Sequence, residues 1–407
     1  MTASYPLRAI AADEFETWAR MVSTTYGQDW REDALSNARW CIEPERTTGV
    51  FDGAELVGGM SIYGRVMTVP GAFVPVAGVT LVAVLPTHQR RGILTAMMRR
   101  QFTELHESSG EPVAALNAAE ATIYGRFGYG IASHLAVVDG DARFMALRGD
   151  VEFGDGTIRL HDAEAARPLL EKVYDTARRD AVGFVDRADR YWDARLYDAE
   201  HTRDGATALR FAVHTDAAGA VTGYAFYRSR QRRVQVVELV ATTRPAYAAL
   251  WRFLIELDAH DHLDYTGATD EVLPHLLVNP RAADTTLVDN LWVRLVDVDR
   301  ALAARRYATD VELVFEVDDA FCGWNAGRFR LSAADDAVSC ERTAARADLR
   351  LSATELGAAY LGGTSLAVLA EAGRVEELTP GALRVAARAF HTDRAPFHPS
   401  GPAFPAF

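Results

Sequence analysis

Residues 82–94 have the sequence VAVLPTHQRRGIL and carry the strongest signal in the chain. The apolar start predicts the end of a strand, and the apolar spacing that begins at Ile93 predicts a helix. The loop between them holds Arg90, Arg91 and Gly92. Free N–H groups at a helix start bind anions, arginines add charge-assisted hydrogen bonds, and glycine allows close backbone approach. The loop therefore predicts an anion site, and the alternative is a basic helix start on a solvated surface.

The flanking segments predict a parallel crossover unit. Residues 78–85 are the most strand-like run, a helix follows with one apolar face, and residues 113–116 form a second strand. We expect a short helix over 120–126 and a final strand of this unit over 134–138.

The same order of elements returns after a Gly- and Asp-rich stretch at 148–156, which predicts a duplicated fold. Its strand-to-helix junction, residues 240–246, has one arginine and no glycine. Residues 291–298 are expected to lead into a third region of strands and two closing helices. We therefore expect a mixed α/β chain, with α and β elements combined in mixed sheets.

The composition limits the partners. Lys and Arg number 43 and Asp and Glu 56, a net charge of −13, which disfavours nucleic-acid binding and suits a cationic small substrate. The three cysteines, Cys41, Cys322 and Cys340, lack metal-site spacing, so we expect reduced thiols and no metal. Neither a secretory signal nor a membrane span is evident, and we expect a cytoplasmic protein.

The loop resembles the Q/R-x-x-G-x-G/A pyrophosphate loop of the GNAT superfamily of N-acetyltransferases. Gln89 and Gly92 match this pattern, whereas Leu94 departs from it. With EPVAALNAAE at 111–120 and AAEATIYGRFGYG at 118–130, the chain resembles the enhanced intracellular survival (Eis) family of mycobacteria and relatives. Close matches cover residues 79–130. Weaker resemblance covers the whole length, including LWVRLVDVDRALAARRY and the terminal Phe407.

The resemblance implies three domains and an activity. Residues 1–147 would form a catalytic GNAT domain that uses acetyl-CoA, and residues 148–292 a second GNAT-like domain without a cofactor site. Residues 293–407 would form a sterol-carrier-protein-like domain whose C-terminal tail enters the active site. The family acetylates amines, aminoglycosides among them and often at several positions, and assembles as a homohexamer.

The resemblance also implies the cofactor contacts. The backbone of Val82 and Val84 would bind the pantetheine arm, and the Val84 N–H would stabilise the acetyl oxyanion. Ala119 would lie beside the thioester sulfur. The pyrophosphate would be held by Gln89, Arg90, Arg91 and Gly92. His88 is expected to be a loop histidine.

The implied catalytic groups are Tyr124, as the general acid that protonates the departing thiolate, and the C-terminal carboxylate of Phe407, as the base. The apolar tail FHPSGPAFPAF is expected to dock rather than remain in water. No acid precedes Phe407, because Pro405 and Ala406 stand there, and Glu120 with a water chain is the fallback base. The weaker substrate-binding candidates are Tyr26, Asp29, Trp30, Glu32 and Asp33.

Two alternatives remain open. One is a protein lysine or polyamine acetyltransferase that uses the same site. The other is a lipid carrier with degenerate acetyltransferase domains, against which the intact loop at 89–92 and Tyr124 argue.

Overall fold

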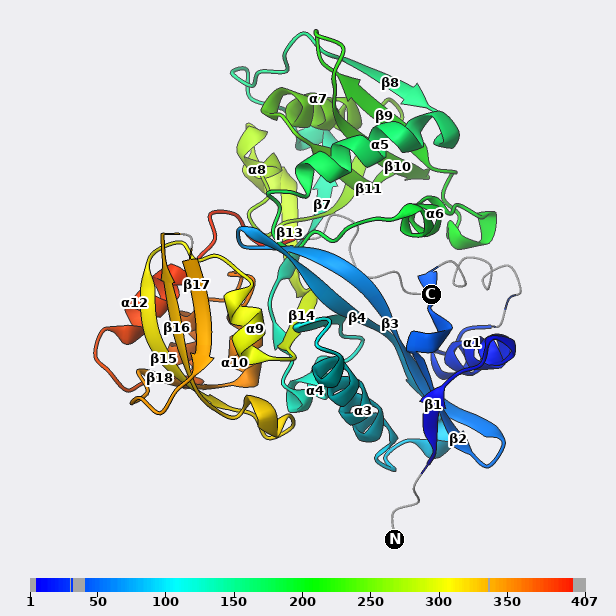
Figure 1. Cartoon of the computed structure of the whole chain (residues 1–407). Coiled ribbons are helices and arrows are strands. Elements are labelled where there is room, and N and C mark those ends of the chain that lie inside the picture. The colour runs from blue at the N-terminus through cyan, green and yellow to red at the C-terminus, as the bar shows by residue number, and fades with distance from the viewer. Residues whose placement is uncertain (1–4, 30, 32–40, 336, 398–407) are drawn as a thin grey trace.

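The computed structural model describes residues 5–29, 31, 41–335 and 337–397, in which the strands form three sheets (Figure 1). The first sheet has the order β1-β2-β3-β4-β5-β14-β6. Its strands are β1 Leu7–Ala9, β2 Thr47–Asp52, β3 Glu55–Val69, β4 Ala72–Val84, β5 Val113–Asn117, β14 Leu291–Leu295 and β6 Gly130–Ile131. Helices α1 (Phe15–Thr25) and α3 (Ile93–Ser108) cover opposite faces of it. Side chains alternate along a strand, so Val76 packs with the α1 cluster and Ala77 with the α3 cluster.

The second sheet has the order β13-β7-β12-β11-β10-β9-β8 and carries helices α5 (Ala163–Ala177) and α7 (Arg244–Ile255). Its strands are β13 Ala283–Asp289, β7 His134–Asp141, β12 His262–Gly267, β11 Arg233–Ala241, β10 Val221–Arg230, β9 Arg210–Thr215 and β8 Thr157–His161. Two short helices, α6 (Asp189–Leu196) and α8 (Leu273–Leu276), lie in its connections. We call this sheet and its helices the second unit, and the first sheet with α1, α3 and α4 (Ala121–Tyr124) the first unit.

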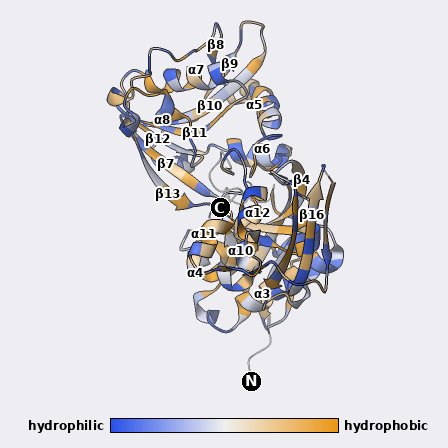
Figure 2. Ribbon diagram, turned by 90° about the vertical axis from the view of Figure 1, so that its left-hand side faces the viewer, coloured by the Kyte–Doolittle hydropathy of each residue, from blue (hydrophilic) through white to orange (hydrophobic). Residues whose placement is uncertain are grey.

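The third unit is built on the sheet β17-β16-β15-β18-β19. Its elements are α9 Val298–Ala303, β15 Val311–Asp318, β16 Gly327–Ala334, β17 Ala337–Arg342, β18 Leu349–Ser352, α10 Ala353–Ala359, α11 Leu366–Glu371, β19 Val375–Glu377 and α12 Ala382–Ala389. Apolar and polar residues alternate along β16, which is buried on one face only (Figure 2).

The first two sheets exchange strands, which corrects two expectations. The segment over 134–138, expected as the last strand of the first unit, lies in β7 and pairs with β12 and β13 of the second sheet. The segment at 291–295, expected to lead into the third region, is β14 and lies between β5 and β6 of the first sheet. The strand at 134–138 was recognised from local sequence, but its pairing and that of β14 are non-local. The domain limits at residues 147 and 292 remain a prediction.

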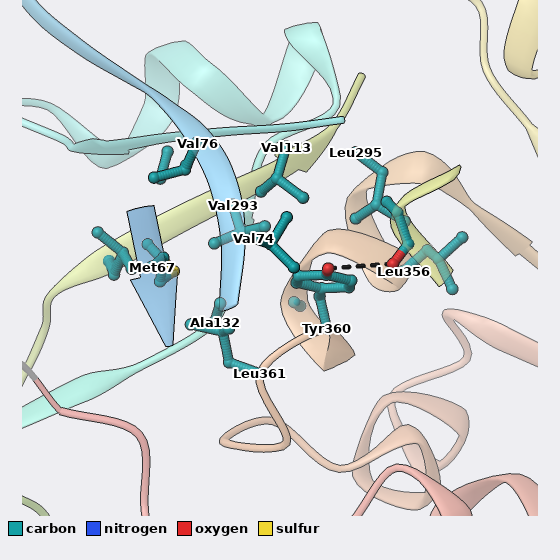
Figure 3. Close-up of a cluster of buried hydrophobic side chains, with 14 of the residues drawn as sticks. Met67, Val74, Val76, Val113, Ala132, Val293, Leu295, Leu356, Tyr360 and Leu361 are labelled. Atoms are coloured by element: carbon teal, nitrogen blue, oxygen red, sulfur yellow. Dashed lines mark hydrogen bonds between the residues drawn. The ribbon is translucent and has the colours of Figure 1, made fainter. Parts of the chain in front are cut away.

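The third unit shares one hydrophobic core with the first. Tyr360 of the α10 end lies beside Val74 of β4, and its hydroxyl donates to the carbonyl of Ala301 at 3.0 Å (Figure 3). Leu356 and Val293 also belong to this core. The third unit is thus packed firmly against the sheet that carries the candidate site.

The glycines of IYGRFGYG make this packing possible. A Cβ atom on Gly130 would overlap the backbone of α10 at Thr354, and one on Gly128, where φ is +85°, would overlap the buried guanidinium of Arg294. Only glycine tolerates such close approach at a positive φ. Gly130 therefore serves the contact with the third unit, and Gly128 makes room for Arg294 of β14 within the first unit.

Candidate active site

The candidate site opens where β4 and β5 separate. The two strands pair in parallel only between Val76–Gly78 and Val113–Ala115, although β4 continues to Val84. Beyond Gly78 the backbone edge of β4 that faces β5 therefore has no neighbouring strand among the described residues. An edge of this kind can accept an extended ligand arm through main-chain hydrogen bonds.

A β-bulge directs the end of β4 toward this opening. Leu81 has φ of +54°, and the register with β3 shifts beside it. The Leu85 N–H donates to the Val57 carbonyl of β3 at 2.9 Å. Backbone groups of successive strand residues point to opposite edges, so those of Val84 face the open side. Two side chains contact carbonyl oxygens at this edge: the Tyr26 hydroxyl donates to Val82 at 3.1 Å and Gln89 Nε2 to Val84 at 3.5 Å.

The loop after β4 presents an anion-binding surface. Arg90 and Gly92 both have positive φ, +62° and +84°, and Gly92 is the N-cap of α3. No side chain of the described part of the chain caps this helix, so its first-turn amides are open to a ligand. Arg91 lies beside them, its Nη1 donating to the Tyr5 hydroxyl at 3.0 Å, and a Cβ atom on Gly92 would meet open space. Gln89, Arg90, Arg91 and Gly92 are all exposed.

His88 has a structural environment, as expected for a loop histidine. It is buried, Nδ1 lies 2.9 Å from the Thr87 hydroxyl, and Nε2 lies 3.2 Å from Asp52. With both ring nitrogens engaged away from the opening, His88 is poorly placed to act as a catalyst.

Tyr124 ends α4 and lies in the same apolar cluster as Val82 and Val84. It is 8% exposed, and its hydroxyl has no hydrogen-bond partner within the described residues. Burial raises the pKa of the Tyr124 phenol above its usual value, and nearby Tyr26 and Glu120 raise it further. The phenol is therefore protonated at neutral pH, the form that a general acid needs. Ala119 lies just before α4 and is exposed.

The structure describes only two of the residues expected to contact the substrate, Tyr26 and Asp29. Tyr26 follows α1 and reaches β4, and burial raises the pKa of its phenol. Asp29 is exposed. Four candidates lie outside the described residues: Trp30, Glu32, Asp33 and Phe407.

The geometry of the first unit fits acetyl-CoA. An unpaired strand edge leads directly to an uncapped helix start with two adjacent arginines, which suits an amide-bearing arm that ends in a pyrophosphate. Among the described residues, no three His, Cys, Asp or Glu side chains cluster as metal ligands would. Within the same residues, no helix is both long and apolar enough to cross a bilayer.

Comparison with known proteins gives the family. Residues 6–132 and 183–295 match families described as acetyltransferase (GNAT) domain, and residues 298–399 match the sterol carrier protein domain. The N-acetyltransferase Eis of Mycobacterium tuberculosis is 38% identical over 85% of both chains. The chain belongs to the Eis family of N-acetyltransferases. An uncharacterized N-acetyltransferase of Streptomyces avermitilis is 41% identical over 97% of this chain and 99% of its own.

A solved structure agrees over the full length. Eis1 from Mycobacterium abscessus is 35% identical, with a TM-score of 0.84 over 97% of this chain and 100% of that one. The expected mixed α/β fold, with two GNAT domains followed by a sterol-carrier-protein-like domain, is therefore confirmed. This Eis-family chain is an acetyl-CoA-dependent N-acetyltransferase.

Within the described residues, the helix start of the first GNAT domain is open, whereas that of the second is capped. In the second unit the Thr243 side chain accepts from the Ala246 N–H at 3.3 Å, and Pro245 removes another first-turn donor. The α7 start therefore has fewer free amides than the start of α3 and lacks its glycine.

Sequence reasoning missed two features of the site. The bulge at Leu81 has no sequence signal, because a leucine at positive φ is held there by the surrounding sheet. The hydrogen bond from Tyr26 to Val82 joins residues 56 positions apart, which no local pattern reports.

Proposed function

We propose that this enzyme acetylates several amines of an aminoglycoside in the cleft between β4 and β5. The observation that supports it best is the continuity of one surface: the free edge of β4 leads to the uncapped start of α3, with Tyr124 in the same cluster. The acetyl group comes from acetyl-CoA, which supplies an activated thioester.

The proposed roles divide along this surface. Backbone groups of Val82 and Val84 hold the pantetheine arm, and Gln89, Arg90, Arg91 and Gly92 hold the pyrophosphate. The Val84 N–H donates to the oxygen on which charge develops. As the amine nitrogen forms its bond to the acetyl carbon, the carbon–sulfur bond breaks and Tyr124 gives its proton to the sulfur.

The base in this proposal is the α-carboxylate of Phe407, which takes the proton that the amine loses. The course of the tail supports it, because the chain leaves the third unit and lies along the second before residue 398. Arg394 Nε donates to Asp270 Oδ2 at 2.6 Å, and the Phe397 N–H donates to Val182 at 2.9 Å. Phe397 is buried, which supports the proposed docking of the tail.

The net charge of −13 supports a polycationic substrate, since a negative field draws cations toward the protein. Tyr26 and Asp29 are proposed substrate contacts, together with Trp30, Glu32 and Asp33. A protein lysine or polyamine substrate is the second candidate, and the same surface charge supports it. The proposal also includes assembly as a homohexamer, which light scattering tests. It further includes a cytoplasmic location, which the free buried thiols of Cys41, Cys322 and Cys340 support.

The Arg90→Ala, Arg91→Ala double variant tests the cofactor site. Each charge-assisted contact to phosphate contributes about 1.5–3 kcal/mol, so we expect acetyl-CoA to bind at least ~10-fold more weakly. Both side chains are exposed, so the melting temperature should hold. Calorimetric titration measures the affinity, and Arg244→Ala at the corresponding start of α7 is the matched control with no expected change. Wild-type affinity in the double variant would exclude this loop as the pyrophosphate site.

A further inference from the structure

The second unit contains a cavity at the position that corresponds to the acetyl-CoA cleft of the first. β11 and β12 pair in parallel only between Arg233–Val236 and His262–Tyr265, and beyond these residues they separate as β4 and β5 do. A cavity of about 590 Å³ lies there, bounded by the end of β11, the start of α7 and the segment after β12. Its volume is within the range of small-molecule sites. We call this cavity the second cleft.

Polar groups without partners line the second cleft. Tyr265 is only 5% exposed, and its hydroxyl makes no hydrogen bond with any described residue. The Tyr247 hydroxyl is buried and equally without a partner in the described part of the chain. Leaving the buried Tyr247 hydroxyl unpaired costs free energy, so a ligand that pairs with it gains affinity.

A carboxylate without a cationic partner lies beside these phenols. Glu271 Oε1 accepts from the Val272 N–H at 2.9 Å, but no arginine, lysine or histidine of the described residues forms an ion pair with Glu271. Burial raises the pKa of the Glu271 carboxyl to about 7, and backbone N–H groups and Arg394 oppose this rise. A bound cation would compensate the buried charge.

The charge balance of the lining favours a cation over an anion. The Asp270 carboxylate already accepts two hydrogen bonds, from Arg394 Nε at 2.6 Å and from the Ala395 N–H at 3.0 Å. The other charged residues of the lining are Glu271, Asp180 and Arg244, of which Asp180 and Arg244 are exposed. Apart from the Asp270–Arg394 pair, the lining thus has two carboxylates and one arginine. The capped start of α7 offers few free amides to an anion.

We propose that the second cleft binds a small organic ammonium ion with an apolar or aromatic body. The ammonium group lies against Glu271, with the oxygens of Tyr247 and Tyr265 as further acceptors and their rings as cation–π partners. The apolar body packs on Phe184 and Leu239. Phe397 forms another wall, so the ligand also contacts the segment that leads into the C-terminal tail. The site binds without chemistry and does not depend on the proposed acetyl transfer.

Calorimetric titration of the full chain with phenethylamine tests this, with phenylacetate as the anion of similar shape. The amine should bind, and Glu271→Gln, which keeps an acceptor for the Val272 N–H, should weaken that binding at least tenfold. The matched control Glu164→Gln removes an exposed charge from the same unit and should leave binding unchanged. Acetyl-CoA affinity should be the same in all three proteins, which separates this site from the first cleft.

Tyr265→Phe provides a second variant in case Glu271→Gln unfolds. It loses no hydrogen bond, so it should melt as the wild type does, and it should bind phenethylamine severalfold more weakly. Wild-type affinity for phenethylamine in a folded Glu271→Gln protein, or in Tyr265→Phe, would overturn the proposal. Phenylacetate binding as tightly as the amine would overturn it as well.

Discussion

Replacing Tyr124 with phenylalanine should lower turnover by ~10²–10⁴, the usual contribution of a positioned general acid. The loss arises because the departing thiolate would no longer receive a proton from the phenol. Acetyl-CoA affinity should persist, since the proposed contacts come from β4 and the loop after it. Stability should hold too, because the Tyr124 hydroxyl has no hydrogen bond to lose within the described residues. Steady-state thiol release at saturating acetyl-CoA measures the effect.

Tyr129→Phe is the matched control for this experiment. Tyr129 is fully buried next to Tyr124, with ring centroids 6.0 Å apart, and its hydroxyl has no partner among the described residues. Tyr129→Phe removes a phenolic oxygen from the same apolar cluster. Because the Tyr129 ring has no access to substrate, turnover should stay near that of the wild type. Near-normal turnover in Tyr124→Phe, or an equal loss in both variants, would leave Tyr124 as a packing residue.

Removing or blocking the terminal carboxylate should nearly abolish amine acetylation while acetyl-CoA still binds. Deleting Phe407 moves the carboxylate back by up to ~3.6 Å of chain, and appended residues convert it to an amide. The displacement is large enough to lose a reactive geometry. An amide at this position has no basic carboxylate to take the proton. Ten residues follow the anchored Phe397, enough to span roughly 35 Å when extended, so the anchor leaves the carboxylate ample reach.

The control for the tail experiment is Phe407→Leu, which keeps the carboxylate at its place in the chain and changes only the ring. It should retain most of the activity, because the proposal assigns the chemistry to the carboxylate. Turnover by thiol release and acetyl-CoA affinity by calorimetry are compared for all three changes. Full activity of a protein extended at its C-terminus would exclude the carboxylate and return attention to Glu120.

Local sequence predicted the elements of the first unit better than their assembly. The strand, loop and helix at 82–94 were predicted as they occur, because apolar spacing and a glycine at the helix start are local signals. The exchange of β7 and β14 between sheets was not, because pairing partners lie far apart in sequence.

The site was predicted in the same uneven way. The motif IYGRFGYG was recognised as a family signature, but only the structure explains Gly128 and Gly130, through Arg294 and α10. The roles of Tyr124, Ala119 and the residues at 82–92 remain predictions, as do those of Phe407 and the candidates around Asp29.

The most direct test of the account is mass spectrometry of kanamycin after incubation with the enzyme and excess acetyl-CoA, with spermidine and a lysine peptide in parallel. We expect kanamycin products that carry more than one acetyl group, with stoichiometric release of thiol. Acetylation of spermidine or of the peptide, with kanamycin unchanged, would contradict the aminoglycoside assignment. Absence of thiol release with every amine would contradict the acetyltransferase activity and favour the lipid-carrier alternative.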